Sequence, residues 1–322
     1  MFRLLSIAAS KLPPTVHPQA EAYLELMKRE HVPLLSTLSP TEARIWDMRV
    51  TSLLTRNSEP INKSEDMQIP APGRMIPIRV YNPSIRNIQG VTLYFHGGGW
   101  VLGNLDQVDY PCRLLANKTG TIVVSVDYRL APECKFPGPL EDCYEVTEWV
   151  AENIRKLGGD TERLIVCGDS AGGNLAVGVS LMAKDRGGPT IANQILIYPV
   201  VDLSDHNYQD LPDELSPGLT KDDMNWFIKH YISREEDLKN QYASPILRTD
   251  LSGLPPVLLI TAEYDILTNQ CNTYAAKLRE AGVRVHPEHY PGLIHGFFTL
   301  PDAFDAAKES IKQTADELSS SV

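Results

Sequence analysis

The chain has 322 residues, of which 43% are hydrophobic and 22% charged, a composition ordinary for a folded protein. This length allows one large domain with a well-buried core, with room for a smaller subdomain. The formal net charge is −11 at pH 7, and no lysine or arginine cluster stands out. Nucleic acid and anionic membranes bind basic surfaces, so neither is expected as the main partner.

The first ten residues faintly imitate a secretion signal, with an apolar stretch at residues 4–9. That stretch is short and is interrupted by Ser6, so export is the weaker interpretation.

Five widely spaced cysteines without a CxxC pair favour a reducing compartment over a disulfide framework or a zinc site. No uninterrupted apolar run is long enough to span a bilayer. The sequence therefore predicts a cytoplasmic protein without a membrane span.

Residues 18–57 have the pattern of two amphipathic helices. The second begins near Ser39, where either Ser39 or Thr41 is a suitable N-cap and Pro40 fits an early helical position. From residue 66 to 81 the pattern changes to two strand-like runs broken by a Pro-Gly pair. A helical segment is therefore expected before the first strands.

From residue 91 onward, short apolar runs alternate with helical patterns. Strands are predicted at residues 91–95, 121–126, 164–167, 195–198, 257–261 and 283–286. Helices are predicted between them, at residues 109–119, 139–157 and 172–186. Short runs of apolar, β-branched residues separated by helices indicate a mostly parallel sheet with helices on both faces.

Residues 200–245 interrupt this alternation. The segment is acidic and carries Trp226 and Phe227 on a helical pattern. We expect an insertion that, together with residues 1–57, covers one end of the sheet. Two interpretations of the aromatic pair remain open, since Trp226 and Phe227 can line a pocket there or belong to ordinary core. No internal repeat or long linker divides the chain.

A Gly-Asp-Ser-Ala-Gly pentapeptide at residues 168–172 matches the pattern GxSxG. A strand-like run precedes it at residues 163–167, and a helical pattern follows at residues 173–184. In this context Ser170 is predicted to sit on a sharp strand-to-helix turn, with its hydroxyl exposed beside a helix N-terminus. The alternative is a glycine-rich connection in which the serine only caps the helix.

A His-Gly-Gly-Gly-Trp segment, residues 96–100, follows the predicted strand at residues 91–95. Successive glycines allow backbone N–H groups to approach a substrate oxygen without steric hindrance, as a tetrahedral oxyanion requires. Gly98 and Gly99 are the expected donors. The amide of Ala171, directly after the serine, is expected to be the third.

A dinucleotide-binding loop is a competing interpretation of these glycines, because an acidic residue, Asp127, ends the next strand. The GxGxxG spacing fails, however, since Leu102 occupies the last glycine position counted from Gly97. His96 resembles a catalytic base by its position in the loop. We expect it to be structural instead, with its ring holding the loop in shape while the amides bind.

The acid of an α/β-hydrolase follows the serine in the chain and precedes the histidine. Glu263 and Asp265 both lie just past the strand predicted at residues 257–261. Either carboxylate can orient an imidazole, so the position relative to the strand leaves the two open.

Three histidines, His286, His289 and His295, follow these carboxylates. His286 and His289 lie in or near a strand pattern and are expected to be surface or packing residues. His295 lies within residues 290–297, which we predict to be a loop before the final helix. A loop at the end of the sheet can bring an imidazole to the serine, so His295 is the expected general base.

Taken together, these motifs resemble the hormone-sensitive-lipase family of esterases, specifically the bacterial group with the Gly-Asp-Ser-Ala-Gly nucleophile motif. The motifs occur in the family's order and extend along most of the chain. The matching segments are residues 17–18, 96–100, 127–133, 158–160, 168–173, 265 and 295–297. The resemblance implies an α/β-hydrolase fold, with a mostly parallel central sheet flanked by helices and a helical cap.

The resemblance also implies that Asp265, rather than Glu263, is the triad acid, because Asp265 occupies the aspartate of the family's Asp-Pro-Leu motif. The sequence departs from the family nearby. Ile266 replaces the proline, and Asn269 and Gln270 stand where acidic residues are common. These changes lie beside the triad and leave it intact.

The same resemblance divides the chain into a cap and a catalytic core. It assigns residues 1–57 and 200–245 to the cap, and residues 58–199 and 246–322 to the core. It further implies that residues 128–133 form a structural brace and take no part in the chemistry.

The expected activity is that of a serine carboxylesterase acting on a small-molecule ester through a Ser170-His295-Asp265 triad. No metal or organic cofactor is required by this chemistry. The preference for short- to medium-chain acyl groups is implied by the resemblance alone. A homodimer is left open.

Two other functions remain as alternatives. One is a binding module, since plant gibberellin receptors resemble this family but lack the triad histidine. The other is a hydrolase with the same triad that acts on an amide, a lactone or a sugar acetate.

Overall fold

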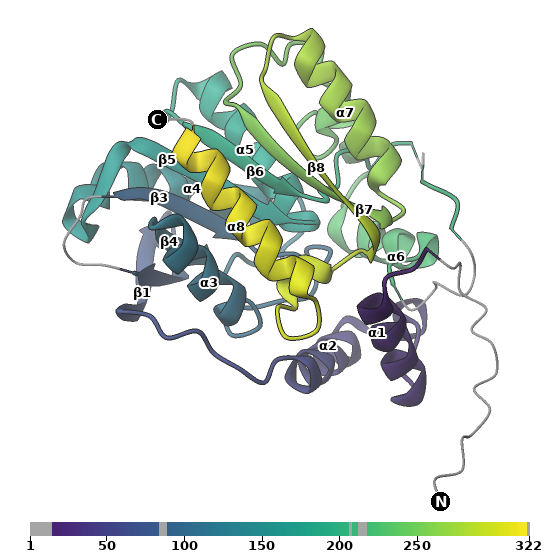
Figure 1. Ribbon diagram of the computed structural model, residues 1–322. Helices are drawn as coiled ribbons and strands as arrows, with labels where there is room; N and C mark the ends of the chain where they lie inside the picture. The colour runs from purple at the N-terminus through teal and green to yellow at the C-terminus, as the bar shows by residue number, and fades with distance from the viewer. Residues whose placement is uncertain (1–14, 84–88, 206–207, 212–217, 321–322) are drawn as a thin grey trace, which may run out of the picture.

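An eight-stranded sheet forms the centre of the molecule, in the order β1-β2-β4-β3-β5-β6-β7-β8 (Figure 1). The computed structural model describes residues 15–83, 89–205, 208–211 and 218–320. The apolar stretch at residues 4–9, which imitates a secretion signal, lies outside the described residues. The strands are β1 (Lys63–Ala71), β2 (Arg74–Asn82), β3 (Gln89–Phe95), β4 (Ile122–Val126), β5 (Gly159–Asp169), β6 (Asn193–Ile197), β7 (Val257–Tyr264) and β8 (Val285–Ile294).

The sheet is mostly parallel, as predicted. Strands β1 and β2 form an antiparallel hairpin, and β2 pairs antiparallel with β4. All pairs from β4 through β3 to β8 are parallel. Every residue of β4 and of β6 is buried, which explains why both strands are mostly apolar and show no alternation of apolar and polar residues.

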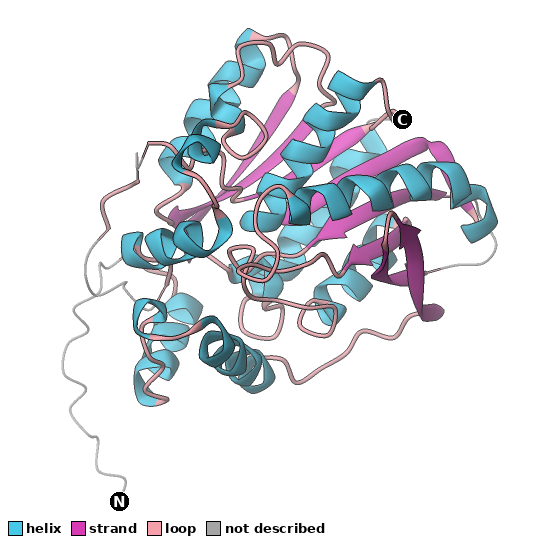
Figure 2. Ribbon diagram, turned by 180° about the vertical axis from the view of Figure 1, so that it is seen from behind, coloured by secondary structure: helices cyan, strands magenta, loops and turns pink. Residues whose placement is uncertain are grey.

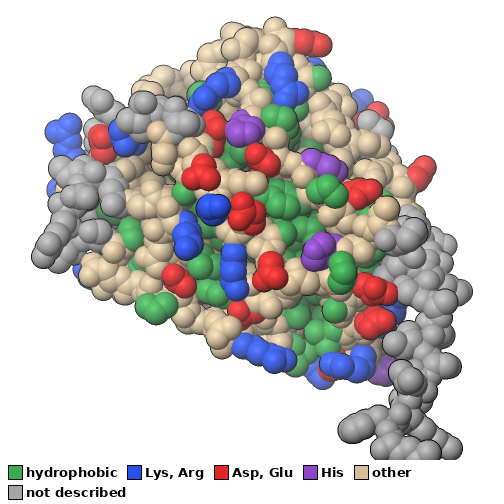
Figure 3. Space-filling model, in the orientation of Figure 1, with side chains coloured by type: hydrophobic (Ala, Val, Ile, Leu, Met, Phe, Trp, Pro, Cys, Tyr) green, Lys and Arg blue, Asp and Glu red, His purple; other side chains and the backbone are tan. Residues whose placement is uncertain are grey.

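Helices cover both faces of this sheet (Figures 1 and 2). They are α1 (Pro18–Arg29), α2 (Pro40–Leu54), α3 (Asp109–Thr119), α4 (Gly138–Asn153), α5 (Ala171–Arg186), α6 (Lys221–Tyr231), α7 (Thr268–Glu280) and α8 (Asp305–Ser320). Of the described helices, none combines the length and the apolar character needed to cross a membrane. On the face in Figure 3, acidic and basic side chains of the described residues are interspersed.

The core is divided into two apolar clusters, one on each face of the sheet. Successive residues of a strand point to opposite faces, and in β3 Leu93 and Phe95 belong to one cluster whereas Tyr94 belongs to the other. Helices α4, α5 and α7 complete the first cluster, and α3 and α8 complete the second. The sheet is thereby held rigidly between two layers, which fixes where its loops begin.

The helix starts follow from capping. The side chain of Ser39 accepts a hydrogen bond from the Glu42 amide, and the Glu42 carboxylate accepts one from the Ser39 amide, so Ser39 rather than Thr41 is the N-cap of α2. Thr220 and Asp223 form the same reciprocal pair at the start of α6. Helix α6 carries Trp226 and Phe227, as the helical pattern within residues 200–245 predicted.

One predicted boundary is wrong. Residues 290–294 were expected to be loop, but β8 continues to Ile294 and pairs with β7, with Tyr290 opposite Ala262 and Ile294 opposite Tyr264. A proline and a glycine, Pro291 and Gly292, lie within this stretch. A register shift between Ala262 and Tyr264 accommodates the extra length, so the strand continues through the pair.

Helices α1, α2 and α6 lie close together at one end of the sheet (Figures 1 and 2). Trp226 of α6 donates a hydrogen bond from Nε1 to the Leu38 carbonyl, 3.1 Å away, which lies directly before α2. The short 3-10 helix η1 (Leu35–Thr37) contacts α6 as well. These elements meet at the end of the sheet where β5, β7 and β8 finish.

Candidate active site

Ser170 lies on the turn that joins β5 to α5, as predicted. Its backbone has φ 55° and ψ −117°, a conformation that non-glycine residues rarely adopt. The neighbouring glycines are required by close packing: a Cβ on Gly172 would lie 1.9 Å from the Phe95 carbonyl oxygen, and one on Gly168 would lie 2.3 Å from the Gly172 carbonyl oxygen. The turn is therefore tight enough to present the Ser170 hydroxyl beyond the strand.

The hydroxyl of Ser170 faces His295, which follows β8 directly. The distance from His295 Nε2 to Ser170 Oγ is 2.9 Å, and the distance from His295 Nδ1 to Asp265 Oδ2 is 2.7 Å. Asp265 is 1% exposed, and its other oxygen accepts a hydrogen bond from the Leu267 amide at 2.9 Å. The three side chains form one hydrogen-bonded chain whose carboxylate end is fixed by the backbone.

Glu263 and Asp265, the two candidates for the triad acid, have different partners. Glu263 accepts a hydrogen bond from the Gly292 amide at 2.7 Å, and only Asp265 faces His295. Gln270, one of the departures from the family pattern, accepts hydrogen bonds from the Val201 and Asp202 amides at 2.7 and 2.9 Å. That side chain therefore fastens α7 to the segment after β6.

The two other late histidines lie in β8 and have partners of their own. His286 Nδ1 is 2.6 Å from a Glu317 carboxylate oxygen of α8, and His289 Nδ1 is 3.0 Å from the Thr261 hydroxyl. Both are packing contacts within or beside the sheet, in agreement with the expectation from the sequence.

The glycine loop after β3 brings backbone amides close to Ser170. Gly98 and Gly99 have φ values of 98° and 58°, in the left-handed region that favours glycine. The loop closes on itself, with the Val101 and Leu102 amides donating to the Gly98 carbonyl at 3.0 and 2.8 Å. Within the described residues, the amides of Gly98, Gly99 and Ala171 have no hydrogen-bond acceptor from the protein.

His96, at the start of the loop, is fully buried. Its Nδ1 lies 2.8 Å from the Gly97 carbonyl oxygen, and its ring stacks on Tyr128 with centroids 4.3 Å apart. Burial lowers the pKa of His96 to about 4, so the ring is neutral at physiological pH. Tyr128 also donates to the His96 carbonyl at 2.7 Å. His96 supports the loop and does not contact the reacting hydroxyl.

The sequence motif alone did not reveal a role for Asp169. This carboxylate, 5% exposed, accepts hydrogen bonds on Oδ1 from the Tyr94 hydroxyl at 2.6 Å and from the Gly97 amide at 3.0 Å. It therefore ties the residue before Ser170 to the glycine loop. Asp169 and Gly97 are 72 residues apart in the sequence. The acidic residue inside the pentapeptide is the one feature of the sequence that could have indicated this contact.

Asp169→Asn is expected to raise thermal stability relative to the parent, increasingly so as the pH rises. Burial raises the pKa of Asp169 above its usual range, so the folded state holds this proton more tightly than the unfolded state. Deprotonation with rising pH therefore disfavours the folded parent, whereas asparagine keeps an oxygen acceptor for Tyr94 and Gly97 and cannot ionise. The measurement is Tm for both proteins from about pH 4 to about pH 8.

Asp66→Asn is the matched control, because hydrogen bonds from Arg79 lower the pKa of Asp66 and the pH trend should have the opposite sign. A Tm difference for Asp169→Asn that does not change with pH would contradict the prediction.

A cavity of about 220 Å³ lies over Ser170 and His295. Beside the glycine loop it is lined by Tyr23 of α1 and by Met224 and Phe227 of α6. Phe227 thus lines the pocket, whereas Trp226 bonds to the segment before α2. Within the described part of the chain, no three His, Cys, Asp or Glu side chains are grouped to hold a metal ion.

Comparison with known proteins identifies the family. A family model described as "alpha/beta hydrolase fold" matches residues 92–299. Carboxylesterase NlhH of Mycobacterium tuberculosis is 40% identical over 242 residues, which cover 73% of this chain and 75% of that protein. The ethyl acetate hydrolase of Pseudomonas putida is 31% identical over 317 residues, covering 94% of this chain and 98% of that protein.

A solved structure has the same fold. The hyperthermophilic esterase from Pyrobaculum calidifontis superposes with a TM-score of 0.88 and is 40% identical, covering 95% of this chain and 98% of that one. The resemblance predicted from the motifs is confirmed. The chain belongs to the α/β-hydrolases and, among them, to the esterases related to hormone-sensitive lipase.

Proposed function

We propose that this chain is a serine carboxylesterase that hydrolyses short- to medium-chain acyl esters through an acyl-enzyme intermediate. The observation that carries the proposal is the hydrogen-bonded chain from Ser170 Oγ through the His295 ring to Asp265, with distances of 2.9 and 2.7 Å. Ser170 attacks the ester carbonyl while His295 takes its proton. Asp265 holds the imidazole in the required tautomer and stabilises the imidazolium that forms.

The developing oxyanion is bound by the amides of Gly98, Gly99 and Ala171. Because these amides have no protein acceptor among the described residues, their hydrogen bonds are available to the substrate. Each such donor contributes about 3 kcal/mol to lowering the barrier. His295 then protonates the leaving alcohol, and a water molecule repeats the sequence on the acyl-enzyme.

Residues 1–57 and 200–245 are proposed to form a cap over this site, although residues 1–14, 206–207 and 212–217 lie outside the described residues. The proposal is supported by Tyr23 of α1 and by Met224 and Phe227 of α6, all of which line the cavity over Ser170. The small volume of that cavity, about 220 Å³, supports a short or medium acyl group at the carbonyl.

Two measurements on the purified protein test the proposal. The first is hydrolysis of 4-nitrophenyl esters of increasing acyl length, where we expect turnover that declines for long chains. The second is mass spectrometry after treatment with an organophosphonate, where we expect one covalent adduct on Ser170.

A protein that forms no adduct and hydrolyses no ester would instead be a binding module. If a matched amide is cleaved faster than its ester, the assignment of the triad stands, but the preferred substrate bond is an amide.

A further inference from the structure

Trp100 follows the three glycines of the loop and has a strained backbone. Its φ is 61°, in the left-handed region that non-glycine residues rarely adopt, and Gly99 before it has φ 58°. Across these two residues, the Gly98 carbonyl accepts hydrogen bonds from the Val101 and Leu102 amides. The five residues therefore form one tight turn, in which the conformation of Trp100 affects the direction of the Gly99 amide.

The side chain of Trp100 is held by a ring of α6. Trp100 and Tyr231 stack with ring centroids 4.2 Å apart and planes 3° from parallel. Both side chains are fully buried, and aromatic pairs stabilise a contact beyond the area that they bury. One turn earlier in α6, the Phe227 ring packs directly against Gly99. Helix α6 therefore supports the turn at two successive residues.

The contact between Trp100 and Tyr231 is one of ring packing alone. Trp100 Nε1 and Tyr231 Oη are buried, and neither atom has a hydrogen-bond partner among the described residues. A buried polar atom without a partner costs free energy. A phenylalanine at position 231 would therefore keep the stack and lose no hydrogen bond.

Tyr231 is itself fixed at the end of α6. Its carbonyl accepts a hydrogen bond from the Phe136 amide at 2.9 Å, and the Phe136 ring meets the Tyr231 ring edge-on with centroids 5.8 Å apart. Lys135 Nζ donates to the carbonyls of Lys229 and Ile232 at 3.2 and 3.0 Å. These contacts fasten the Tyr231 ring to the loop that follows β4.

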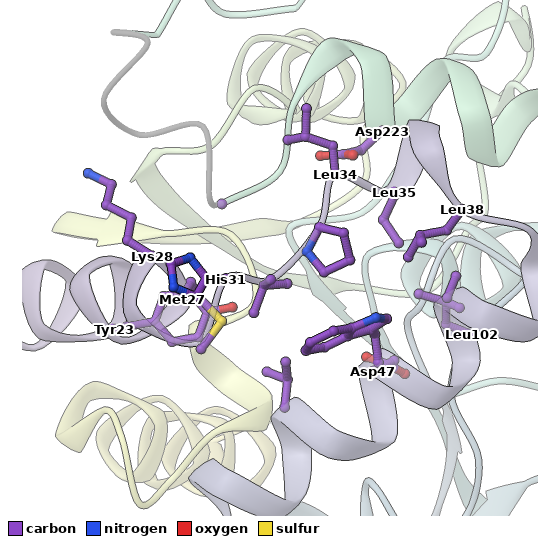
Figure 4. A pocket seen from close by; sticks show the side chains of 16 residues that line it. Tyr23, Met27, Lys28, His31, Leu34, Leu35, Leu38, Asp47, Leu102 and Asp223 are labelled. Atoms are coloured by element: carbon purple, nitrogen blue, oxygen red, sulfur yellow. The ribbon is translucent and has the colours of Figure 1, made fainter.

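The end of the turn borders a cavity. Leu102 lines a cavity of about 470 Å³ between α1 and α2, and in Figure 4 it lies on the same side of this cavity as Leu38. Close packing resists movement elsewhere in a protein interior, but side chains do not enclose the turn on this side. The turn therefore has room to relax if the ring behind Trp100 is lost.

We infer that Tyr231 is a positioning residue for ester hydrolysis. Its ring holds Trp100 in the left-handed conformation, which keeps the amides of the turn aimed at the oxyanion. The inference rests on the proposed function, in which Gly98 and Gly99 supply two of those amides. Tyr231 does not line the cavity over Ser170, so it acts through Trp100.

The first test replaces the ring and measures kcat and KM on 4-nitrophenyl acetate. Tyr231→Leu is expected to lower kcat by about 10- to 100-fold, because a misplacement of about 1 Å or the loss of one oxyanion donor has effects of this order or larger. KM should stay within about threefold of the parent, since the affected bond is made mainly in the transition state. Tyr231→Phe should keep both constants within about threefold.

An inhibitor, 1,1,1-trifluoropropan-2-one, reports on the oxyanion separately from turnover. The Ser170 oxygen adds to its carbonyl carbon, the hydroxyl proton passes to His295, and the carbonyl oxygen becomes an oxyanion beside the loop amides. Tyr231→Leu should raise its inhibition constant by about the factor by which it lowers kcat/KM. A substitution that only destabilises the fold would not change this constant for the protein that remains folded.

Tyr274→Leu is the matched control. Tyr274 is a tyrosine of α7 that is 1% exposed, and within the described part of the chain its hydroxyl also lacks a hydrogen-bond partner. The substitution should lower Tm, because it removes a buried ring. Its kcat per active site and its inhibition constant should stay within about threefold of the parent.

Phe136→Leu is the second variant and decides the outcome if Tyr231→Leu does not fold. It loosens Tyr231 from the side opposite Trp100, so kcat should fall by about three- to tenfold, with a matching rise in the inhibition constant. If both constants are unchanged in this variant, the inference fails.

The inference also fails if Tyr231→Leu leaves kcat and the inhibition constant within about threefold of the parent, or raises KM alone. It fails as well if Tyr231→Phe or Tyr274→Leu has the same effect as Tyr231→Leu. In each of these cases, turnover by the parent protein leaves the esterase proposal standing. Absence of turnover on every ester by the parent protein overturns both.

Discussion

Ser170→Ala is expected to lower kcat for ester hydrolysis by about 10⁴- to 10⁶-fold while the protein remains folded. In the proposed mechanism, the substitution removes the oxygen that forms the acyl-enzyme and leaves the amides of Gly98, Gly99 and Ala171 in place. Attack of water on an ester carbonyl that the same amides bind can then account only for a small residual rate. The measurement is kcat on a 4-nitrophenyl ester, with Tm and circular dichroism as evidence of folding.

Ser180→Ala is the matched control for this substitution. Ser180 is a buried serine of α5, the helix that begins after Ser170, and its hydroxyl donates to the Ala176 carbonyl at 2.9 Å. Its replacement should leave kcat within a few-fold of the parent. A kcat for Ser170→Ala within tenfold of the parent would exclude Ser170 as the nucleophile.

The sheet could be predicted from the sequence because burial on both faces leaves a continuous apolar signal. Strands such as β4 and β6 have no exposed residue, so most of their residues are apolar and the alternation of a half-exposed strand is missing. The end of β8 could not be predicted in the same way. Its last residues include Pro291 and Gly292, and only pairing with β7 shows that the strand continues to Ile294.

The site was predictable to the extent that each residue lies at the end of a strand. Ser170 and His295 could be proposed from motif and chain order. Glu263 and Asp265 could not be separated by position, because both lie at the end of β7. Their roles depend on which carboxylate meets His295 and which meets Gly292, and those partners lie 30 and 29 residues farther along the chain.

The residues that shape the pocket were not predictable from periodicity. Phe227 lies so close to Gly99 that a Cβ there would be 2.1 Å from its ring, a contact between a helix and a loop more than a hundred residues apart. A helical pattern shows that Trp226 and Phe227 share α6, but not which of them faces the site. That choice is made by the packing of α6 against η1 and by the hydrogen bond from Trp226 to the Leu38 carbonyl.

Asp265→Asn is expected to reduce kcat by about 10⁴-fold with a much smaller change in KM. In the parent, the carboxylate accepts a hydrogen bond from His295 Nδ1 at 2.7 Å, so that Nε2 is free to accept the Ser170 proton. An asparagine can donate its amide hydrogen to Nδ1, which favours the tautomer whose Nε2 already carries a proton and is no base. The measurement is kcat and KM on one ester for both proteins.

Glu263→Gln is the control that tests the choice of acid. The Glu263 carboxylate accepts a hydrogen bond from the Gly292 amide, and a glutamine oxygen can accept the same bond, so kcat should stay within a few-fold of the parent. The two carboxylates lie two residues apart on the same strand end, and the substitutions are chemically equivalent. If Glu263→Gln lowers kcat more than Asp265→Asn does, the acid is misassigned. Conversion to an amide should impair catalysis only at the carboxylate that holds the imidazole.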